Sequence, residues 1–343
     1  MNNDIHYSED IYTLMSLIER VHPTSVLVVC DKNTYKHCFP LVQNIMPALK
    51  CAIMESGEEH KTLKTVNDLW NIMYEMGFDR DSLLINLGGG VVTDLGGFAA
   101  SCYKRGVRFI NVPTTLLGMI DAAIGGKVGV NHHGVKNELG VFNYADLVLI
   151  HPPFLKTLPE EELKSAMGEA YKYALLYGKT PFAKRIFSTD SIDIENMMWL
   201  VDGCLGVKLS YCRADPYDRD RRNVLNLGHT IGHAIEAWMT KNVGESRHGY
   251  CVAWGLVYAL WLSTRINGYP YSAFVAHRER IKARFGCPPC IMYDWMEPYL
   301  RDDKKRCGKD IFFVLLNEEG KPEVKPVWPQ IIEEAIKKAF SEE

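Results

Sequence analysis

Closely spaced cysteines are scarce in this sequence, although it contains ten cysteines in 343 residues. Only Cys287 and Cys290 lie within a few residues of each other, in the segment CPPC. A structural zinc site would need a second such pair or histidines at finger spacing, and the sequence has neither. The cysteines are therefore expected to be reduced thiols, which favours a cytoplasmic protein.

A strong charge of either sign and a long apolar run are lacking as well. The net charge is −3, from 39 basic and 42 acidic residues, so neither nucleic acid nor an anionic membrane is an expected partner. The longest apolar stretch, residues 251–262, is too short to span a bilayer. Residues 1–10 are polar and acidic, unlike a secretory signal. Local basic sites in such a protein favour a small anionic substrate.

The first half of the chain alternates short apolar runs with helical patterns, which is typical of a parallel α/β sheet. A helix is expected at residues 62–76, where Val66, Leu69 and Met73 recur at helical spacing. Strands are expected at residues 25–30, 52–54, 82–87, 107–112 and 147–150.

Long helical patterns replace the strands from about residue 158 onward. Helices are expected at residues 160–178, 195–212, 228–242, 248–267, 272–285 and 328–341, with a hairpin at 311–316 and 323–327. The length suits two domains. We therefore predict an α/β protein with a Rossmann-like parallel-sheet nucleotide domain, residues 1–155, followed by a mostly α-helical metal and substrate domain, residues 156–343.

A glycine-rich turn follows one of the expected strands, in the segment LLINLGGGVVTDLGG of residues 83–97. Glycines allow close approach of a phosphate, and a helix N-terminus supplies free N–H groups. The spacing is not G-x-G-x-x-G, so a tight strand-to-helix turn remains the alternative. Asp31 could bind a ribose diol or cap a turn. The segment from Ser56 to Lys61 could likewise bind a nucleotide or cap a helix.

A possible metal site centres on the segment NLGHTIGHAIE, where His229 and His233 share one helix face. Thr230 stands where a zinc protease has its glutamate, which argues against a protease. His248 and Glu169 could complete a catalytic metal site with an open position. The alternatives are an unliganded histidine pair and, for Glu169 and Lys172, a surface ion pair.

Several cations and polar residues lie beside glycines or on otherwise apolar patterns. The Lys and Arg side chains among them could bind phosphate or carboxylate oxygens, and any one of the group could instead be an ordinary solvated surface residue. They are Arg105, Asp121, Lys127, Lys136, Asn137, Lys208, Arg222, Lys304 and Lys305.

Six motifs occur in order between residues 56 and 305: GGGVVTDLGGFAASCYKRG, VPTTLLGMIDAAIGGKVGVN, KNELGVF, GEAYKY, NLGHTIGHAIE and the HG that begins at His248. Together they resemble the sugar-phosphate cyclases, most closely the branch that forms 3-dehydroquinate. The resemblance implies NAD, a divalent metal (zinc or cobalt) and a homodimer. It also implies conversion of 3-deoxy-D-arabino-heptulosonate 7-phosphate into 3-dehydroquinate and phosphate, in the shikimate pathway. NAD would be reduced and reoxidised within one turnover, and an aldol closure would complete the ring.

The resemblance also assigns residues by motif. The implied metal ligands are Glu169, His229 and His248. The implied NAD contacts are Ser56, Gly57, Glu58, Glu59, His60, Lys61, Gly89, Gly90, Val91, Val92, Thr93, Asp94, Thr114, Thr115, Lys127, Lys136, Phe154, Leu155, Lys156 and Thr157. Asp31 is a further candidate, from its place after a strand alone. The implied substrate and catalytic residues are Arg105, Asp121, Lys127, Asn137, Lys172, Lys208, Arg222, Asn226, His233 and one of Lys304 and Lys305.

The chain departs from the family pattern beside this site. Pro216 replaces a glutamate, Asp220 replaces a glycine, and Gly168 replaces the alanine that usually precedes the metal-binding glutamate. Two enzymatic alternatives stay open: a cyclase acting on glucose 6-phosphate or sedoheptulose 7-phosphate, and a metal-dependent alcohol or glycerol dehydrogenase. A non-catalytic binding protein would leave the predicted metal site and the cations unexplained.

Overall fold

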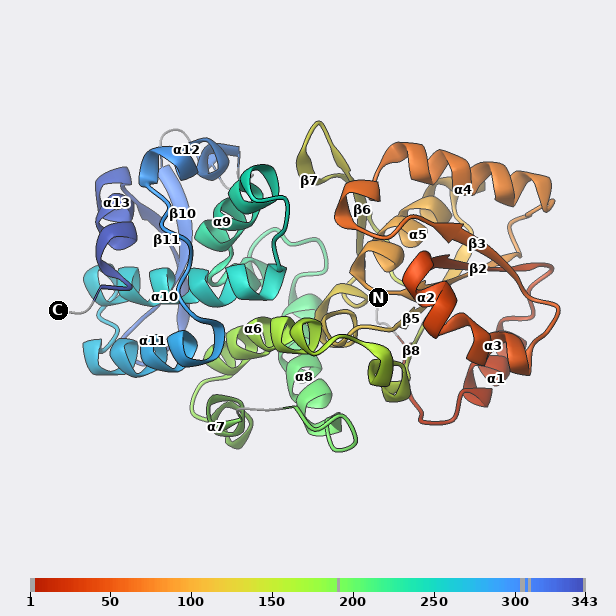
Figure 1. The fold of residues 1–343 in the computed structure, drawn as a ribbon, viewed down its shortest axis with the longest axis horizontal. Coiled ribbons are helices and arrows are strands. Elements are labelled where there is room, and N and C mark those ends of the chain that lie inside the picture. Colours follow the sequence, from red (N-terminus) through yellow and green to blue (C-terminus); the bar gives the residue numbers. More distant parts are fainter. Residues whose placement is uncertain (1–3, 190–191, 303–305, 308–309, 342–343) are drawn as a thin grey trace. The chain divides into compact units, whose positions relative to one another are not determined.

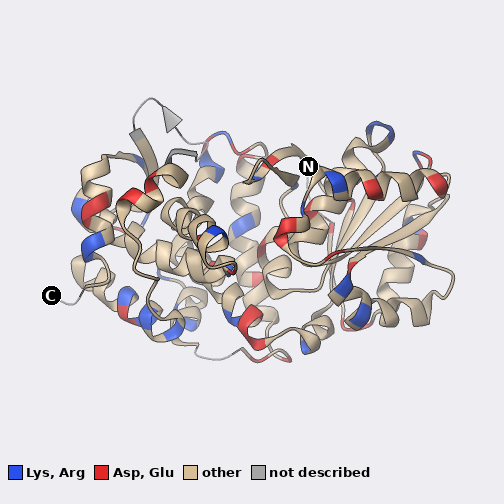
Figure 2. Cartoon of the chain, turned by 45° about the horizontal axis from the view of Figure 1, so that its top comes forward, with Lys and Arg blue, Asp and Glu red and all other residues tan. Residues whose placement is uncertain are grey.

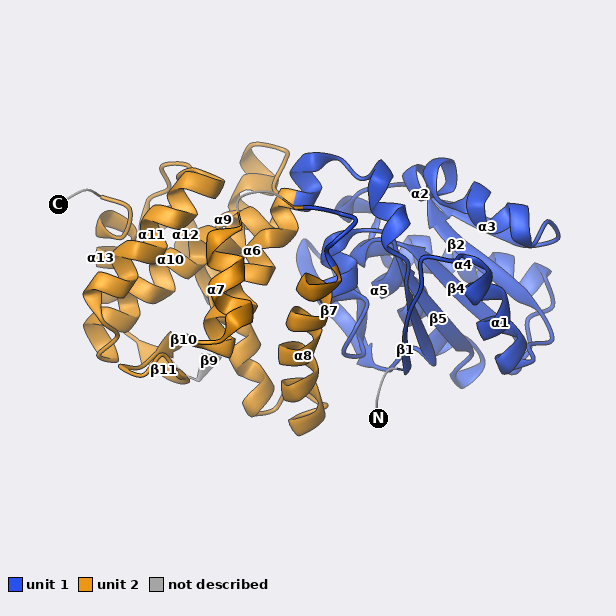
Figure 3. Cartoon of the chain, turned by 90° about the horizontal axis from the view of Figure 1, so that it is seen from below, with its two compact units in different colours: residues 1–163, 193–197 blue, residues 164–192, 198–343 orange. Residues whose placement is uncertain are grey.

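The computed structural model of the chain describes residues 4–189, 192–302, 306–307 and 310–341. The chain forms two compact units, shown in Figure 3. The first, called the sheet unit below, is Met1–Leu163 with Asp193–Met197. The second, called the helical unit, is Lys164–Ile192 with Met198–Glu343.

The sheet unit is built on a six-stranded parallel sheet with the strand order β1-β8-β5-β4-β2-β3. The five predicted strands are confirmed. The sheet also contains β1, a short and partly exposed edge strand whose sequence, DIHY, has no apolar run. The strands are β1 (Asp4–Tyr7), β2 (Val26–Asp31), β3 (Lys50–Met54), β4 (Leu83–Gly88), β5 (Arg108–Pro113) and β8 (Leu147–Ile150).

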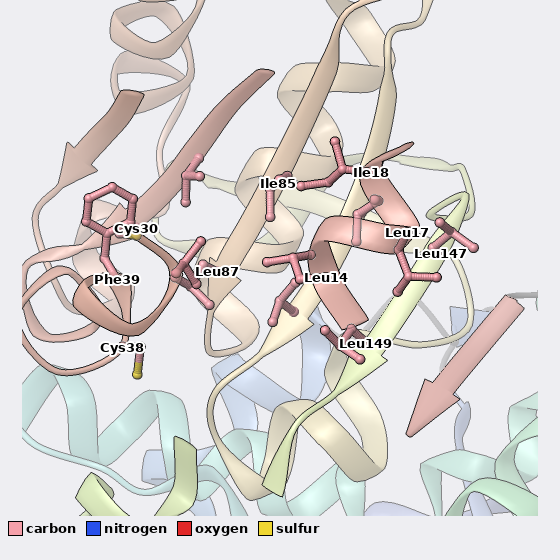
Figure 4. Packing of buried hydrophobic residues seen from close by; sticks show 14 of the residues in the cluster. Leu14, Leu17, Ile18, Cys30, Cys38, Phe39, Ile85, Leu87, Leu147 and Leu149 are labelled. Atoms are coloured by element: carbon pink, nitrogen blue, oxygen red, sulfur yellow. The ribbon is translucent and has the colours of Figure 1, made fainter. Parts of the chain in front are cut away.

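Helices pack on the sheet and bury its apolar side chains. On one face, α1 (Tyr12–Val21) contributes Leu14, Leu17 and Ile18, spaced to lie on one side of the helix. They pack with strand residues such as Ile85 and Leu149 (Figure 4). The helix α5 (Gly90–Cys102) contacts β4 and β5. The predicted helix at residues 62–76 is α4 (Leu63–Glu75), capped by Thr62.

The sheet unit has further elements that the sequence patterns did not indicate. An antiparallel hairpin of β6 (Lys127–His132) and β7 (Val135–Phe142) carries three of the predicted site residues. The short elements are α2 (Lys32–His37), α3 (Phe39–Ile45), η1 (Glu58–His60), η2 (Tyr103–Arg105), η3 (Gly118–Ala122) and η4 (Pro152–Thr157).

The helical unit confirms the predicted change to long helices (Figure 1). Its helices are α6 (Glu160–Tyr177, most of which lies in this unit), α7 (Pro181–Ser188), α8 (Met198–Ala214), η5 (Arg221–Asn226), α9 (His229–Asn242), α10 (His248–Ile266), α11 (Tyr271–Phe285), α12 (Tyr293–Asp302) and α13 (Pro329–Lys338). The predicted hairpin is β10 (Asp310–Leu316) and β11 (Pro322–Val327), joined at the edge by β9 (Arg306–Cys307).

A buried hydrogen bond links two helices of this unit. Tyr171 Oη on α6 lies 2.7 Å from His277 Nδ1 on α11, and the Phe187 ring packs against both. Burial, helped by the nearby Arg280, lowers the pKa of His277 to about 4. This histidine is therefore neutral at physiological pH.

No helix in the described part of the chain is long and apolar enough to cross a membrane. The nine cysteines whose side chains are described, Cys287 and Cys290 included, are free thiols. Acidic and basic residues are interspersed over the helices of each unit (Figure 2), in keeping with the near-neutral net charge.

Candidate metal and nucleotide sites

Glycines let α10 touch two other helices of the helical unit backbone to backbone. A Cβ atom on Gly249 would collide with the carbonyl oxygen of Ser165 on α6. A Cβ atom on Gly255 would collide with the carbonyl oxygen of Gly228, which immediately precedes α9. Helices α6, α9 and α10, which carry the predicted metal ligands, therefore converge at the beginning of α10.

Gly168, one of the departures from the family pattern, takes part in this contact. A Cβ atom at this position would collide with the carbonyl oxygen of Gly249. The usual alanine would not fit this helix crossing without movement of backbone. The departure therefore allows α6 to lie especially close to α10 beside Glu169.

The three predicted metal ligands meet where these helices cross. Glu169 Oε1 lies 3.0 Å from His229 Nε2 and 3.1 Å from His248 Nε2, and the Glu169 side chain is completely buried. Two ligands on one tetrahedral zinc ion, each with a bond of about 2.1 Å, are about 3.4 Å apart. One carboxylate oxygen and two imidazole nitrogens thus have the chemistry and spacing of a divalent-metal site.

Both histidine rings are held from behind through their other nitrogen atom. His229 Nδ1 lies 3.1 Å from the carbonyl oxygen of Leu227, and His248 Nδ1 lies 3.1 Å from Glu236 Oε2. An acceptor at Nδ1 favours the tautomer that carries its proton there, which leaves the Nε2 lone pair available for a metal. The groups that contact the two Nδ1 atoms therefore also suit a metal site, in addition to the three ligands.

The protonation of the three groups reflects burial and mutual attraction. Burial opposes ionisation of Glu169, but the adjacent Lys172 and His229 outweigh it and hold its pKa well below the usual range. Burial lowers the pKa of His229 despite the Glu169 carboxylate. Burial acts in the same direction on His248, but Glu236 and Glu169 outweigh it and raise its pKa to about 10. A metal binding here must therefore displace a proton from His248.

Lys172 belongs to the same buried cluster. Its Nζ atom lies 2.5 Å from Glu169 Oε2, and its side chain is only 2% exposed. The Nζ atom also lies 4.5 Å from the centre of the Tyr173 ring. The alternative of a solvated surface pair is therefore wrong for Glu169 and Lys172.

His233 lies one turn beyond His229 and is exposed. Its ring centre is 4.9 Å from that of His229 and 5.7 Å from that of His248. Potential ligand atoms of the three histidines all lie within 4.8 Å of one another. His229 and His248 thus belong to two possible ligand sets, completed by either Glu169 or His233.

Other predicted substrate residues of the helical unit precede α9. Lys208 on α8 and Arg222 are both buried, so for them the alternative of a solvated surface charge is wrong. Arg222 Nη1 donates to the carbonyl oxygen of Pro216, whereas its buried Nε makes no hydrogen bond within the described parts of the chain. Asn226 Nδ2 donates to the carbonyl oxygen of Asn223. An unsatisfied guanidinium N–H is suited to an anionic ligand.

The segment that departs from the family pattern is organised by Asp215. Its carboxylate accepts hydrogen bonds from the backbone N–H groups of Arg219, Asp220 and Arg222. Asp218 within this loop has a φ of 53°, in the left-handed region. Asp215 therefore fixes the loop that leads to Arg222, although this loop contains the two departures from the family pattern, Pro216 and Asp220.

In the sheet unit, the predicted NAD residues gather at one edge of the sheet. Because the strands are parallel, the segments that follow β2, β3, β4, β5 and β8 all leave from their carboxyl ends. Asp31 is the last residue of β2, and the following segments contain Ser56–Lys61, Gly89–Asp94, Thr114–Thr115 and Phe154–Thr157. This edge is where open parallel sheets bind nucleotides.

The glycine turn is packed so tightly that larger residues would not fit. A Cβ atom on Gly88 would lie 2.5 Å from the Val92 side chain, and one on Gly89 would lie 3.0 Å from that of Thr115. The helix α5 begins immediately afterwards, at Gly90. The turn therefore presents a helix N-terminus at the carboxyl edge, and the buried Thr114 hydroxyl beside it has no hydrogen-bond partner among the described residues.

Asp31 and Lys61 already have protein partners at this edge. Asp31 caps α2, where its Oδ1 accepts from the Thr34 N–H at 2.8 Å, as the turn-cap alternative predicted. The buried Lys61 Nζ donates to Asp94 Oδ2 at 2.6 Å and to Asn137 Oδ1 at 2.5 Å. Thr62, rather than the Ser56–Lys61 segment, caps α4. Lys61 thus joins a predicted NAD residue to a predicted substrate residue.

The remaining predicted residues are more scattered or lie outside the described part of the chain. Arg105 is exposed in η2 with a φ of 66°, and Asp121 lies in η3. Lys127 begins β6 and is exposed, whereas Lys136 is half-buried in β7. Lys304 and Lys305 lie outside the described residues.

Two residues with a place in these sites were missed from the sequence. Glu236 is seven residues after His229, so helical spacing alone could have put it on the same face. Asn131 contacts both Glu58 and Asn137, and no spacing rule indicates contacts so distant along the chain. Only the folded arrangement of the β6–β7 hairpin reveals them.

Known proteins resemble this chain over most of its length. The family models for the 3-dehydroquinate synthase N-terminal and C-terminal regions match residues 51–165 and 166–306. A 3-dehydroquinate synthase of Parabacteroides distasonis is 36% identical over 313 residues, 90% of this chain and 88% of that protein. One of Pyrococcus furiosus is 36% identical over 340 residues, 96% of this chain and 97% of that protein.

Solved structures agree with the fold. A 2-deoxy-scyllo-inosose synthase complexed with carbaglucose-6-phosphate, NAD⁺ and Co²⁺ has a TM-score of 0.85 at 25% identity, covering 97% of this chain and 96% of that one. A probable glycerol dehydrogenase from Sinorhizobium meliloti has a TM-score of 0.61 at 18% identity, covering 99% and 96%, so it shares the fold alone. With the family models matching most of the chain, the protein belongs to the 3-dehydroquinate synthase family, whose members are phosphate-eliminating cyclases.

Proposed function

We propose that the chain converts 3-deoxy-D-arabino-heptulosonate 7-phosphate into 3-dehydroquinate and phosphate, the reaction of its family. The observation that carries this proposal is the convergence of Glu169, His229 and His248 beside the buried cation Lys172. The conversion requires a site that binds hydroxyl groups and stabilises negative charge, and this cluster has the groups to do both.

Glu169, His229 and His248 would hold the metal ion, with Leu227 O and Glu236 fixing the two rings. When bound, a divalent metal polarises hydroxyl and carbonyl oxygens as a Lewis acid. The Lys172 ammonium lies 2.5 Å from Glu169 Oε2 and so keeps this carboxylate ionised. His233, one turn away and exposed, would remain outside the ligand set and exchange protons with the substrate.

The carboxyl edge of the sheet would hold NAD, with the α5 N-terminus against the pyrophosphate and the unpartnered Thr114 hydroxyl as a further donor. When bound, the nicotinamide accepts and returns a hydride. The remaining proposed contacts are those that the family motifs assign, from Ser56–Lys61, Gly89–Asp94, Thr115, Lys127, Lys136 and Phe154–Thr157. Asp31 would contact NAD while it also caps α2.

The cations would recognise a substrate with two anionic ends. Lys172, Lys208 and Arg222 are all buried in the helical unit, and Arg222 has a free N–H to offer. Lys172 is already paired with Glu169, whereas the buried Arg222 Nε has no hydrogen-bond partner among the described residues, so a substrate carboxylate or phosphate would stabilise this guanidinium. Asn226, Asn137, Arg105, Asp121, Lys127 and one of Lys304 and Lys305 would add polar contacts to the same substrate.

A competition between substrates tests this assignment. The protein with NAD and zinc or cobalt is given the heptulosonate phosphate, glucose 6-phosphate or sedoheptulose 7-phosphate, and phosphate release is measured. We expect a kcat/KM at least a hundredfold higher for the heptulosonate phosphate, since about 2.7 kcal/mol is a modest contribution for a carboxylate bound by buried cations. Preference for either of the other sugars would contradict the proposal.

We also propose the domain bounds, oligomeric state and compartment of the enzyme. We expect a nucleotide domain at residues 1–155, a metal and substrate domain at residues 156–343, and a homodimer in the cytoplasm. The free thiols suit a reducing compartment. Light scattering after size-exclusion chromatography should give a mass twice the chain's 39.0 kDa. A monomer mass would contradict the expected dimer but not the proposed activity.

A further inference from the structure

We propose that Asn131 is a positioning residue that ties the nucleotide-contact segment Glu58–Lys61 to the substrate-contact residue Asn137. The inference rests on the proposed function, because that function gives these two parts their ligands. Asn131 itself contacts neither ligand in this account. Its role is to hold both parts in one geometry, so that cofactor binding and substrate orientation depend on the same side chain.

The first half of the connection joins Asn131 to the segment that precedes α4. The Asn131 N–H donates to the carbonyl oxygen of Lys61 at 2.9 Å, and Asn131 and Thr62 form a parallel β-bridge. The Asn131 Nδ2 group donates to Glu58 twice, to Oε1 at 2.9 Å and to the carbonyl oxygen at 3.2 Å. The side chain and backbone of Asn131 therefore hold both ends of this segment.

The second half of the connection joins Asn131 to Asn137 across the turn of the hairpin. Asn131 Oδ1 accepts a hydrogen bond from the Asn137 N–H at 2.9 Å. Asn137 has a φ of 52°, a left-handed conformation that a residue with a side chain adopts at a cost of about 1 kcal/mol or more. The bond from Asn131 is one of the interactions that stabilise this conformation.

Lys61 closes the connection into a ring. Its Nζ atom donates to Asn137 Oδ1 at 2.5 Å and to Asp94 Oδ2 at 2.6 Å, and it is only 4% exposed as a side chain. The path Asn131–Lys61–Asn137 thus returns to Asn131 through hydrogen bonds alone. A ring of this kind transmits displacement, because moving Glu58–Lys61 changes the position of the Asn137 amide.

The test compares Asn131→Ala with Asn143→Ala in the full-length protein. Asn143 follows the same hairpin, and its Nδ2 donates to Ser101 Oγ at 2.8 Å, so this control also removes an asparagine hydrogen bond. NAD affinity is measured by calorimetry, and KM and kcat by phosphate release. We expect Asn131→Ala to weaken NAD binding and raise the substrate KM, each about tenfold, with a smaller change in kcat. Values equal to those of Asn143→Ala for both quantities would overturn the proposal.

A second variant keeps the size of the side chain and tests the contact with Glu58. Asn131→Asp retains the acceptor for Asn137 but places a carboxylate against Glu58 Oε1, so we expect weaker NAD binding. In the Glu58→Gln background, the same substitution regains a donor–acceptor pair and should weaken NAD binding several-fold less. An equal loss in both backgrounds would contradict the direct contact.

Amide hydrogen exchange separates this inference from the proposed function. In Asn131→Ala, the amide of Asn137 and those of residues 58–62 should exchange faster than in the wild type and in Asn143→Ala. Unchanged exchange would overturn the positioning role whatever the enzyme catalyses. A wild-type protein that fails to bind NAD would instead contradict the proposed function, while the exchange result would still decide the role of Asn131.

Discussion

Glu169 Oε1 and His229 Nε2 lie 3.0 Å apart inside the helical unit, with the carboxylate completely buried. The two residues are sixty positions apart in the chain, and α10 brings their helices together through Gly249 and Gly255. A buried carboxylate beside two imidazoles and one lysine is costly to assemble unless the groups bind something. A divalent metal ion held by Glu169 and the two histidines would satisfy these groups.

The ligand set is expected to be Glu169, His229 and His248 rather than the three histidines. Replacing any of those three by alanine should remove bound zinc, because each supplies a donor atom within the cluster. His233→Ala should retain one zinc ion per chain and lose turnover. Elemental analysis after gel filtration decides between the sets: zinc lost from His233→Ala but kept in Glu169→Ala would favour the three-histidine site.

Glu236 is expected to strengthen metal binding through His248. Its Oε2 lies 3.1 Å from His248 Nδ1, so Glu236→Ala frees the ring, whereas Glu236→Gln leaves an oxygen acceptor in place. We expect zinc affinity to fall about 10–100-fold in Glu236→Ala and less in Glu236→Gln. Competition with a chromophoric chelator measures both. The control is Asn242→Ala, at an exposed residue of the same helix. An equal loss of zinc affinity in this variant would mean that the effect comes from a general disturbance of α9 and not from the contact with His248.

Gly168→Ala is expected to weaken the metal site although it adds only a methyl group. The new Cβ would meet the backbone of Gly249 rather than a flexible side chain, so α6 or α10 must move. That movement separates Glu169 from His248, and zinc affinity should fall. Gly206→Ala on α8 has open space at the Cβ position and should leave affinity unchanged. Equal affinity in the two variants, measured by the same chelator competition, would argue against this close crossing.

His277 is expected to make the protein less stable as the pH falls. Its pKa is lowered to about 4 by burial, against an ordinary value of 6.5. Between these values the unfolded chain binds more protons than the folded one, so acid favours unfolding. The contribution is fully present above pH 6.5 and is lost towards pH 4, on the order of 3 kcal/mol in total.

Urea unfolding of the wild type and His277→Gln at pH 7 and pH 5 measures this effect. The wild type should lose more unfolding free energy between the two pH values than the variant does. The comparison within each protein removes the cost of losing the hydrogen bond to Tyr171. Identical losses in both proteins would mean that His277 does not titrate as its burial implies.

Local sequence patterns predicted much of the fold, because apolar periodicity records which face of each element is buried. They identified β2, β4 and β5 and the long helices, but not β1 or the β6–β7 hairpin, because β1 and β7 are largely polar or exposed and β6 has only three buried residues. Motifs likewise placed Glu169, His229 and His248 on their helices. For Asp31 the sequence allows both a capping role and ribose binding, and the structure shows the capping role.

The contacts that complete the site could not be read from spacing. Glu236 reaches His248 only because α9 and α10 cross at Gly228 and Gly255, and Lys61 reaches Asn137 only because the hairpin folds against η1. These contacts depend on backbone approach between segments far apart in sequence. Burial of Lys172 is of the same kind, since an i,i+3 pair with Glu169 has the same pattern on a surface helix.

The central claim, that the enzyme eliminates phosphate and uses NAD without consuming it, can be tested in one cuvette. The zinc- or cobalt-loaded protein is mixed with NAD and 3-deoxy-D-arabino-heptulosonate 7-phosphate, and inorganic phosphate and the NADH absorbance are followed together. We predict many phosphates released per enzyme, with NADH never exceeding the enzyme concentration. NADH that accumulates steadily with turnover, or with a simple alcohol in place of the sugar phosphate, would contradict the account and identify a dehydrogenase.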